Sequence, residues 1–386
     1  MTGPHASPGR GSRGLKVLDR YLGVWLVLAL GCMRRKRPLP KTIRRIALVK
    51  TAAIGDSILL VPVINRIVAA FPGCRCRLFL GPGNAQMGPF YDLPSEVVSF
   101  GHPLQAWRRL RDFRADVIID FEPWARVSAL ICTLSTPFSV GFKRPGQAKH
   151  FAFDHPVLHS RQVHEMDNYR QLAAALGVSG IPDPHLSGAD RRSFTGQKRL
   201  PEHPYIVIHP WPGGFNAERR EWMTSRWADL ARRVCDLKVE ILISGAPDDA
   251  PRSSELSQAI SRPKLCRSIA GKYALHEMVA VLSGAAAMIS VNTGIMHLAA
   301  ATGIPVLALN GPTNPRRWGA LGAASININS TTPGSAYLDL GFETHGDERP
   351  CMESISVDRV WKVLRPILVQ RLETRLAALP SSASAR

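Results

Sequence analysis

The sequence has no cysteine pattern that would bind zinc or build a disulfide framework. Its seven cysteines are scattered, contain no Cys-x-x-Cys pair, and are odd in number. Cys74 and Cys76 stand two positions apart, which is the wrong spacing for either arrangement. We therefore expect reduced thiols, as in a protein that faces the cytosol.

The sequence also lacks the residue clusters that hold a metal ion. No two aspartates stand two positions apart, so the chain contains no Asp-x-Asp pair. His155, His159 and His164 recur at intervals of four and five residues, but no carboxylate or cysteine completes a coordination set with them. We predict no metal site.

Acidic residues are almost absent from the start of the chain. Residues 1–45 hold eleven Lys and Arg but one acid, Asp19, so they supply ten of the +19 net charges. Residues 21–33 between these cations are uncharged, but thirteen residues are fewer than the roughly 20 that span a bilayer. The basic run 34–37 follows directly and makes a poor signal-peptide cleavage region.

A short apolar helix beside clustered cations is typical of segments that bind anionic lipid. We therefore predict that residues 15–37 contact a membrane surface, as a peripheral or monotopic attachment. Whether residues 21–33 lie on the membrane, re-enter it or span it stays open. Nucleic acid is not expected as a partner, because no aromatic-spaced binding motif accompanies the cations.

The length of 386 residues and the 45% hydrophobic content are typical of two folded domains. Apolar runs of strand length alternate with helical stretches in both halves. This predicts an α/β protein with two doubly wound, Rossmann-like domains that face a central cleft. The expected segments are a membrane-associated extension (1–44), a first domain (45–185), a linker (186–203), a second domain (204–360), and a terminal helix with a tail (361–386). Strands are expected at 46–49, 76–80, 97–100, 117–120, 139–142, 205–208, 239–244, 285–291 and 306–309, and helices at 57–71, 103–113, 125–135, 167–177, 225–235, 251–261, 276–283 and 296–301.

One turn between a strand and a helix has the features of an anion site. Asn292, Thr293, Gly294 and Ile295 follow an apolar strand, and His297 lies in the Ala-rich helix that comes next. Such a helix points unpaired backbone N–H groups and its positive dipole end at a ligand. The alternatives are an ordinary turn capped by Asn292 or Thr293, and a core histidine at position 297.

Four sequence blocks together resemble glycosyltransferase family 9, the heptosyltransferases that build the lipopolysaccharide core. The blocks are residues 46–57, 220–230, 269–278 and 291–301, the last of which continues to 310–319. The resemblance covers about residues 45–363. It implies the GT-B architecture and metal-independent transfer of a sugar, with inversion, from a nucleotide-diphosphate sugar, usually ADP-heptose. The acceptor it implies is a lipopolysaccharide core or a similar anionic glycolipid at the cytoplasmic side of the bacterial inner membrane.

The resemblance also implies roles for particular residues. Asp56 would be the base that removes the acceptor proton, although an aspartate there would also suit the N-terminus of the next helix. Arg220 would hold the diphosphate, and the adjacent Arg219 offers the same chemistry. Thr293, Gly294, Ile295 and His297 would form the phosphate-binding turn.

Further positions bear on the donor and the acceptor. Asp249 resembles a ribose ligand but equally suits a helix N-terminus, and His209 and Gly213 would shape the donor pocket. Asn292 departs from the family, because many relatives carry Asp there, which leaves the donor sugar open. The cations expected to face an anionic acceptor are Arg108, Arg109, Arg111, Lys143, Arg144 and Lys149.

Two other functions remain open at this point: a GT-B-type nucleotide-sugar epimerase, and a non-catalytic module that binds nucleotide sugars or membranes. No cofactor is expected besides the nucleotide sugar as co-substrate. An epimerase would not need the basic and apolar segment at residues 21–37.

Overall fold

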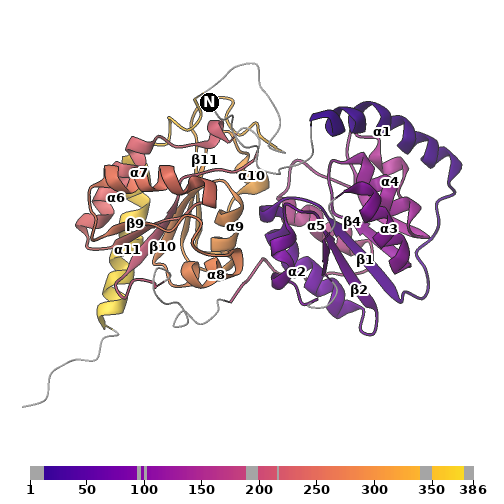
Figure 1. Ribbon diagram of the computed structural model, residues 1–386, viewed down its shortest axis with the longest axis horizontal. Coiled ribbons are helices and arrows are strands. Elements are labelled where there is room, and N and C mark those ends of the chain that lie inside the picture. Colours follow the sequence, from indigo (N-terminus) through magenta and orange to yellow (C-terminus); the bar gives the residue numbers. More distant parts are fainter. Residues whose placement is uncertain are drawn as a thin grey trace, which may run out of the picture. The chain divides into compact units, whose positions relative to one another are not determined.

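The computed structural model describes residues 13–93, 97–99, 102–187, 199–214, 217–339 and 350–377 (Figure 1). The chain divides into two compact units, Met1–Pro184 and His185–Arg386, and each is described by itself. Residues 1–12 of the predicted extension, 188–198 of the predicted linker, and the predicted tail from 378 lie outside the described residues.

Unit 1 is built around a six-stranded parallel sheet in the order β3-β2-β1-β4-β5-β6. The strands are β1 (Arg45–Lys50), β2 (Arg75–Leu80), β3 (Val97–Ser99), β4 (Val117–Asp120), β5 (Phe138–Lys143) and β6 (His155–Leu158). β1 lies between β2 and β4, with Val49 in register with Phe79 and Asp120. Its near-continuous apolar sequence follows from this central position, because both of its faces are covered by helices.

The helices of unit 1 are α1 (Arg13–Met33), α2 (Ile54–Ala70), η1 (Ala85–Phe90), α3 (Pro103–Phe113), α4 (Arg126–Leu134), η2 (Lys149–Phe151) and α5 (Glu165–Ala174). Side chains of β1, β2, β4, α3 and α4 make up one core cluster of this unit. No helix among the described residues combines the length and the apolar character needed to cross a membrane.

Unit 2 repeats this plan with a parallel sheet in the order β12-β11-β10-β7-β8-β9. Its strands are β7 (Tyr205–His209), β8 (Glu240–Ile243), β9 (Cys266–Ser268), β10 (Ala287–Val291), β11 (Val306–Asn310) and β12 (Ser325–Asn329). Its helices are η5 (Glu218–Arg220), α6 (Thr224–Asp236), η6 (Pro247–Asp249), α7 (Ala250–Ile260), α8 (Leu275–Ser283), α9 (Gly294–Ala301), α10 (Pro315–Trp318) and α11 (Val357–Ala377).

Both sheets therefore have the strand order of a doubly wound nucleotide-binding fold, as predicted. The order of the chain reverses between β1 and β4 in unit 1, and between β7 and β10 in unit 2. In such sheets the ligand crevice lies at the carboxyl ends of the strands at this switch point.

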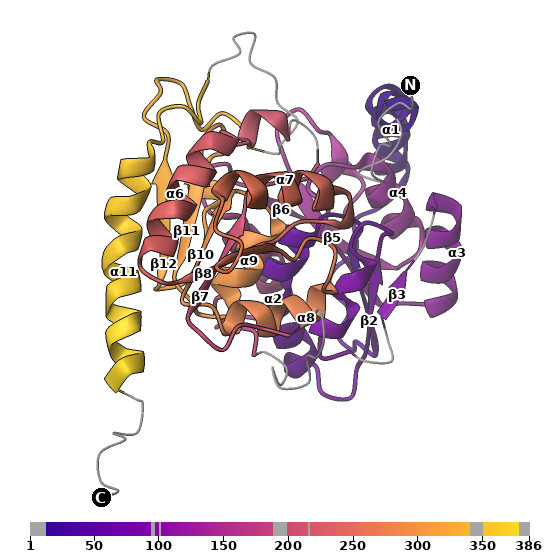
Figure 2. The same ribbon diagram turned by 60° about the vertical axis from the view of Figure 1, so that its left-hand side comes forward.

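The ends of the chain differ from the prediction. Helix α1, expected within a separate extension, packs on α4 and η2 of unit 1, as both ribbon views show (Figures 1 and 2). Its Val27 is fully buried with Ala129 and Phe153. Helix α11 begins at Val357, ahead of the expected residue 361, and joins the core of unit 2. Both terminal helices therefore belong to the units that they cover.

Candidate active site

Asp56 lies at the switch point of unit 1, in the first turn of α2 and just past the carboxyl end of β1. Its side chain is buried, with 5% of its surface exposed. Oδ2 accepts a hydrogen bond from the Ala53 backbone N–H at 3.1 Å, and Oδ1 accepts one from the Tyr169 hydroxyl at 3.0 Å. The carboxylate thus stabilises the start of the helix and also lies at the ligand edge of the sheet, so the two predicted roles are compatible.

Lys50, the last residue of β1, lies between two carboxylates. Its Nζ is 3.8 Å from Oδ2 of Asp56 and 3.7 Å from Oε1 of Glu122, and the side chain is 1% exposed. Glu122 also accepts hydrogen bonds from the backbone N–H groups of Thr51 and Ala52. Burial alone would raise the pKa of Glu122, but the Lys50 ammonium and the hydrogen bond from Thr51 hold this pKa below its usual range.

A second buried ion pair lies beside the first. Nζ of Lys149 is 2.8 Å from Oδ2 of Asp120, the last residue of β4, and donates a hydrogen bond to the Glu122 backbone carbonyl. Lys149 is 1% exposed, so the expectation that it faces an acceptor is wrong: its ammonium is used inside the fold. Arg144 is likewise buried, whereas Lys143 is exposed.

In unit 2, the predicted phosphate-binding turn lies at the carboxyl end of β10. The Asn292 amide donates to Oδ1 of Asn310 at 2.8 Å and to the Trp318 carbonyl at 2.7 Å, which ties β10 to β11 and α10. Thr293 is the N-cap residue of α9, with an extended backbone and no hydrogen bond from its side chain to the helix. Thr293 therefore occupies the N-cap position that one alternative gave it, but without the side-chain hydrogen bond of a cap.

The geometry around this turn brings three predicted residues together. Arg220, in η5, donates from Nη1 to the Asn292 carbonyl at 3.1 Å and from Nη2 to the Gly213 carbonyl at 2.6 Å. The guanidinium is therefore held next to the residue that precedes the turn. Arg219 is adjacent in η5 and is half-buried.

His209 ends β7, on the other side of the same switch point. It is 8% exposed, and its Nδ1 lies 2.8 Å from the Ser244 hydroxyl. Burial lowers the pKa of His209 to about 4, although the nearby Asp249 opposes this shift, so the ring is neutral at physiological pH. His297, on α9, is 5% exposed, as expected of a histidine on a buried helix face.

Asp249 follows β8 and uses its carboxylate locally. Oδ2 accepts from the Ala246 backbone N–H at 2.7 Å, and Oδ1 pairs with Arg252 at 2.6 Å. This is the helix N-terminal role that the sequence allowed. The Arg252 guanidinium also lies 4.2 Å from the ring centre of Trp211.

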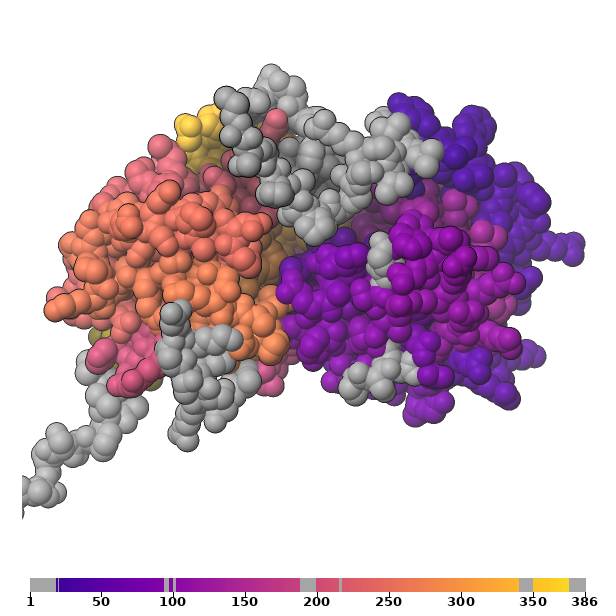
Figure 3. Space-filling view, viewed as in Figure 1, coloured from indigo at the N-terminus to yellow at the C-terminus, as the bar shows by residue number. Residues whose placement is uncertain are grey.

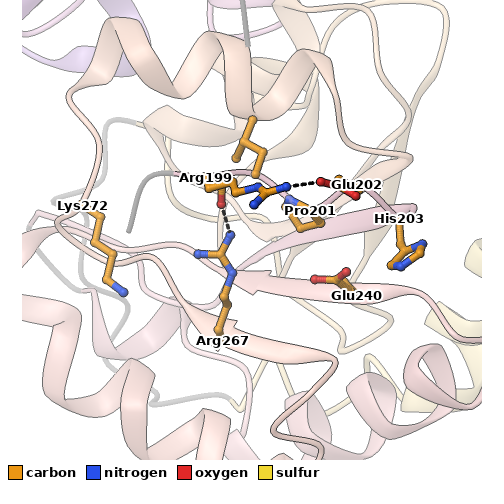
Figure 4. Close-up of a pocket in the computed structure, with 8 residues that line it drawn as sticks. Arg199, Pro201, Glu202, His203, Glu240, Arg267 and Lys272 are labelled. Atoms are coloured by element: carbon orange, nitrogen blue, oxygen red, sulfur yellow. Dashed lines mark hydrogen bonds and ion pairs between the residues drawn. The ribbon is translucent and has the colours of Figure 1, made fainter. Parts of the chain in front are cut away.

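A cavity of about 550 Å³ lies elsewhere in unit 2 (Figure 4). Residues that precede or begin β7 and β8, such as His203 and Glu240, contribute to it, so it lies away from the carboxyl ends of these strands. Arg267 donates to the Arg199 carbonyl across this cavity. None of the predicted site residues lines it. Among the described residues, no group of three or more His, Cys, Asp and Glu is arranged to hold a metal ion.

Sequence reasoning missed three residues around Asp56: Lys50, Glu122 and Tyr169. A signal was present for two of them. Lys50 directly follows the apolar run 46–49 of β1, and Glu122 comes three residues after the apolar run 117–119 of β4. Charges at the ends of buried strands need partners of opposite sign, so a cation after β1 and an anion after β4 could have been paired. Tyr169 gave no such signal within its helix.

Comparison with known proteins identifies a family. Residues 104–339 match the model of glycosyltransferase family 9 (heptosyltransferase). Lipopolysaccharide heptosyltransferase 1 of Pseudomonas aeruginosa is 25% identical over 322 residues, which cover 75% of this chain and 84% of that protein.

Solved structures of similar fold agree with this. ADP-heptose lipopolysaccharide heptosyltransferase II of E. coli has a TM-score of 0.68 at 19% identity, covering 85% of this chain and 99% of that one. E. coli heptosyltransferase WaaC with ADP-2-deoxy-2-fluoro heptose has a TM-score of 0.60 at 21% identity, covering 83% and 99%. The fold is therefore the predicted GT-B architecture. The family model spans more than half of the sequence, and the chain belongs to glycosyltransferase family 9, the heptosyltransferase family, as a glycosyltransferase enzyme.

Proposed function

We propose that this enzyme transfers a heptose from a nucleotide-diphosphate heptose, with ADP-heptose as the first candidate, to a lipopolysaccharide-core or similar anionic glycolipid. The similar proteins named above are lipopolysaccharide heptosyltransferases, and one was solved with an ADP-heptose analogue. The observation that carries the mechanism is the buried Asp56 carboxylate at the switch point of unit 1, oriented by hydrogen bonds from Tyr169 and Ala53.

In the proposed reaction, Asp56 takes the proton of the acceptor hydroxyl as its oxygen attacks the anomeric carbon. A new carbon–oxygen bond forms on one face of the sugar, and the bond to the diphosphate breaks on the other, so the configuration inverts. The carboxylate accepts hydrogen bonds from Ala53 and Tyr169, and these two contacts fix its orientation for the proton transfer.

The nucleoside diphosphate leaves with the bonding electron pair, and its negative charge must be stabilised. We assign this task to Arg220, helped by backbone N–H groups of the turn at Thr293, Gly294 and Ile295. Arg220 is suited to it because its two hydrogen bonds to backbone carbonyls fix the guanidinium beside the turn. His297, His209, Gly213, Asp249 and Arg219 remain candidate donor contacts.

A metal-independent mechanism is supported by the Arg220 guanidinium and by the absence of an Asp-x-Asp pair from the full sequence. Asn292 is consistent with it, because an amide adds no negative charge where a diphosphate would bind. Family membership favours the transferase over the epimerase and over the non-catalytic module.

We also propose that the enzyme works at the cytoplasmic side of the inner membrane, peripherally attached through residues 15–37. Support comes from the scarcity of acids in this segment and from the lipid nature of the proposed acceptor. Exposed cations of unit 1, such as Arg108 and Lys143, remain candidate contacts to the anionic acceptor.

The test is Asp56→Asn, which keeps the size of the side chain but removes the base. We expect turnover of ADP-heptose with a lipopolysaccharide-core acceptor to fall by roughly 10²- to 10⁴-fold. ADP-heptose should still protect the variant against heat, because the donor is proposed to bind unit 2. ADP release measures turnover, and NMR of the product anomeric proton tests inversion.

The matched control is Asp92→Asn, an exposed aspartate of the same unit, which should leave turnover unchanged. Turnover by Asp56→Asn within tenfold of the wild-type enzyme would eliminate Asp56 as the base. Retention of configuration in the product would overturn the inverting mechanism even if Asp56 proved essential.

A further inference from the structure

Helix α1 has two opposite faces with different surroundings. The inner face comprises Asp19, Gly23, Val27 and Gly31, which recur every four residues, and Arg34 follows directly after the helix. A Cβ atom added to Gly31 would lie 2.8 Å from the Phe151 carbonyl, and one added to Gly23 would lie 3.3 Å from Arg126. These glycines therefore allow α1 to approach α4 and η2 closely.

Polar contacts hold the two ends of this inner face. Asp19 accepts a hydrogen bond from the Val127 backbone N–H at 2.8 Å and pairs with Arg126 at 3.5 Å. Near the other end, Arg34 pairs with Asp154 at 3.0 Å, and its partner Asp154 also accepts from the Arg37 backbone N–H. Helix α1 is thus a fixed part of unit 1 rather than a loose tether.

The outer face carries exposed apolar side chains. Tyr21, Leu22, Trp25, Leu26 and Met33 are 66%, 48%, 71%, 48% and 86% exposed. Figure 3 shows atoms of α1, in indigo, at the surface of unit 1. Soluble monomers rarely expose contiguous apolar patches of this kind without a binding role.

Cations border the outer face at its C-terminal end. Arg35, Lys36 and Arg37 are exposed and follow α1 directly. The pKa of His150 is lowered by burial and also by the charges of Lys143 and Lys36, so both of these ammonium groups lie near the His150 ring. Phe151 is 46% exposed and stacks on His150 with 4.4 Å between ring centres.

We infer that the outer face of α1, bordered by Arg35, Lys36, Arg37 and Lys143, docks unit 1 on an anionic lipid bilayer, with α1 lying in the plane of the interface. Aromatic and aliphatic side chains enter the boundary between head groups and acyl chains, while the cations contact lipid phosphates. This inference rests on the proposed membrane association. It names the surface that contacts the membrane, which lies on a helix packed against α4 and η2 of unit 1.

The position of α1 in unit 1 bears on how the acceptor approaches Asp56. The N-terminal part of α1 contacts the start of α4, which follows β4, and β4 ends next to β1 and the Asp56 turn. The N-terminal part of α1 therefore lies at the carboxyl edge of the sheet, the edge at which Asp56 stands, so docking through α1 would bring this edge towards the lipid-linked acceptor.

The experiment measures co-sedimentation of the full chain with vesicles of phosphatidylethanolamine and phosphatidylglycerol, and with neutral phosphatidylcholine vesicles. Wild-type protein should bind the anionic vesicles and lose affinity with salt. Tyr21→Ser with Trp25→Ser should weaken binding about tenfold or more, because each removes a large apolar side chain from the interface. Arg35→Gln, Lys36→Gln and Arg37→Gln together should weaken it about 100-fold, at about fivefold for each cation.

The controls change exposed residues of unit 2: Met223→Ser removes an exposed apolar side chain, and Lys238→Gln, Lys264→Gln and Lys272→Gln together remove three exposed positive charges. They should bind like the wild type. Equal loss in both sets, or no loss in either α1 set, overturns the inference. So does a concentration-dependent dimer that the Tyr21 and Trp25 changes abolish, since a second copy would then cover the face.

Turnover separates this inference from the proposed reaction. The α1 variants should lose turnover more than tenfold with an acceptor embedded in vesicles and keep it with a detergent-dispersed acceptor. An enzyme that binds vesicles but never transfers heptose would refute the proposed function and leave the docking surface intact.

Discussion

Replacing Lys50 by Met removes one positive charge from a site where this ammonium faces two carboxylates. Met keeps the length of the apolar stem, so packing in β1 changes little. Asp56 and Glu122 lose the cation that lies 3.8 and 3.7 Å from their oxygens, while both remain more than nine-tenths buried. Removal of one partner from a buried ion pair costs about 3–5 kcal/mol, because the remaining charge is uncompensated.

This cost has a measurable size. For a unit of 184 residues, 1 kcal/mol shifts the melting temperature by about 2–4 °C, so we expect unit 1 to melt roughly 6–20 °C earlier near neutral pH. Lys50→Arg retains the charge and should lose less. Lys238→Met, an exposed lysine of unit 2, should leave the melting temperature unchanged.

The pH dependence separates charge from packing. In the folded wild type, the pKa of Glu122 lies below its unfolded value, so its contribution to stability is present above the unfolded pKa, about 4.3, and is lost as pH falls through the folded pKa. In Lys50→Met, burial is no longer opposed by the ammonium, so the pKa of Glu122 rises and the carboxyl takes up a proton at higher pH. The difference in melting temperature between the variant and the wild type should therefore decrease as pH falls from 7.5 to 5.

The assay is differential scanning calorimetry of both proteins at pH 7.5, 6 and 5. A difference in melting temperature that stays constant over this range would refute the electrostatic reasoning, because destabilisation by a cavity or by strain does not depend on pH. A difference of less than about 2 °C at pH 7.5 would show that water or another cation compensates the two carboxylates.

Two further predictions concern unit 2. Arg220→Gln should lower kcat/KM for ADP-heptose by roughly 10²- to 10³-fold, because it removes a fixed cation from the leaving diphosphate, whereas Arg219→Gln should lower kcat/KM by less than tenfold. Steady-state ADP release compares the two variants, and the reverse ranking would assign the phosphate contact to Arg219. The pKa of His209 is about 4 in the folded protein and about 6.5 in the unfolded chain. The contribution of the neutral ring to the free energy of unfolding, at most about 3 kcal/mol, is therefore complete above pH 6.5 and is lost as pH falls toward 4. His209→Asn should flatten the stability curve of unit 2 between pH 7 and 4.5, and an unchanged slope would mean that the ring does not stay neutral.

The central strands were predictable because burial on both faces requires long apolar runs. The predicted strand 117–120 coincides with β4, and strand 306–309 differs from β11 by one residue. The missed strands β6, β9 and β12 all lie at sheet edges. β9 is the three-residue sequence Cys-Arg-Ser, and β12 alternates Ser and Asn with Ile, so neither has an apolar run. Edge strands are specified by pairing to one neighbour, which a single sequence does not display.

The candidate site was predictable only where the residues share a local motif. The turn after β10 and the position of Asp56 after β1 follow from strand, turn and helix signals in adjacent residues. The contacts of Lys50 with Glu122 and of Lys149 with Asp120 join residues 72 and 29 positions apart along the chain. Such pairs depend on which strands are neighbours. The same reason explains why the sequence predicts that Lys149 faces the acceptor, although it pairs with Asp120 inside the fold.

The two switch points differ in a way that fits the proposed division of labour. At the edge of unit 1, two carboxylates, Asp56 and Glu122, share the ammonium of Lys50, so this group of three side chains keeps negative charge, which suits a base. At the edge of unit 2, the residue before the proposed phosphate-binding turn is Asn292, whose amide donates to Asn310 and Trp318, and Arg220 donates to the Asn292 and Gly213 carbonyls. We therefore propose that the departing diphosphate meets this guanidinium in unit 2, and that the proton of the acceptor meets the Asp56 carboxylate in unit 1.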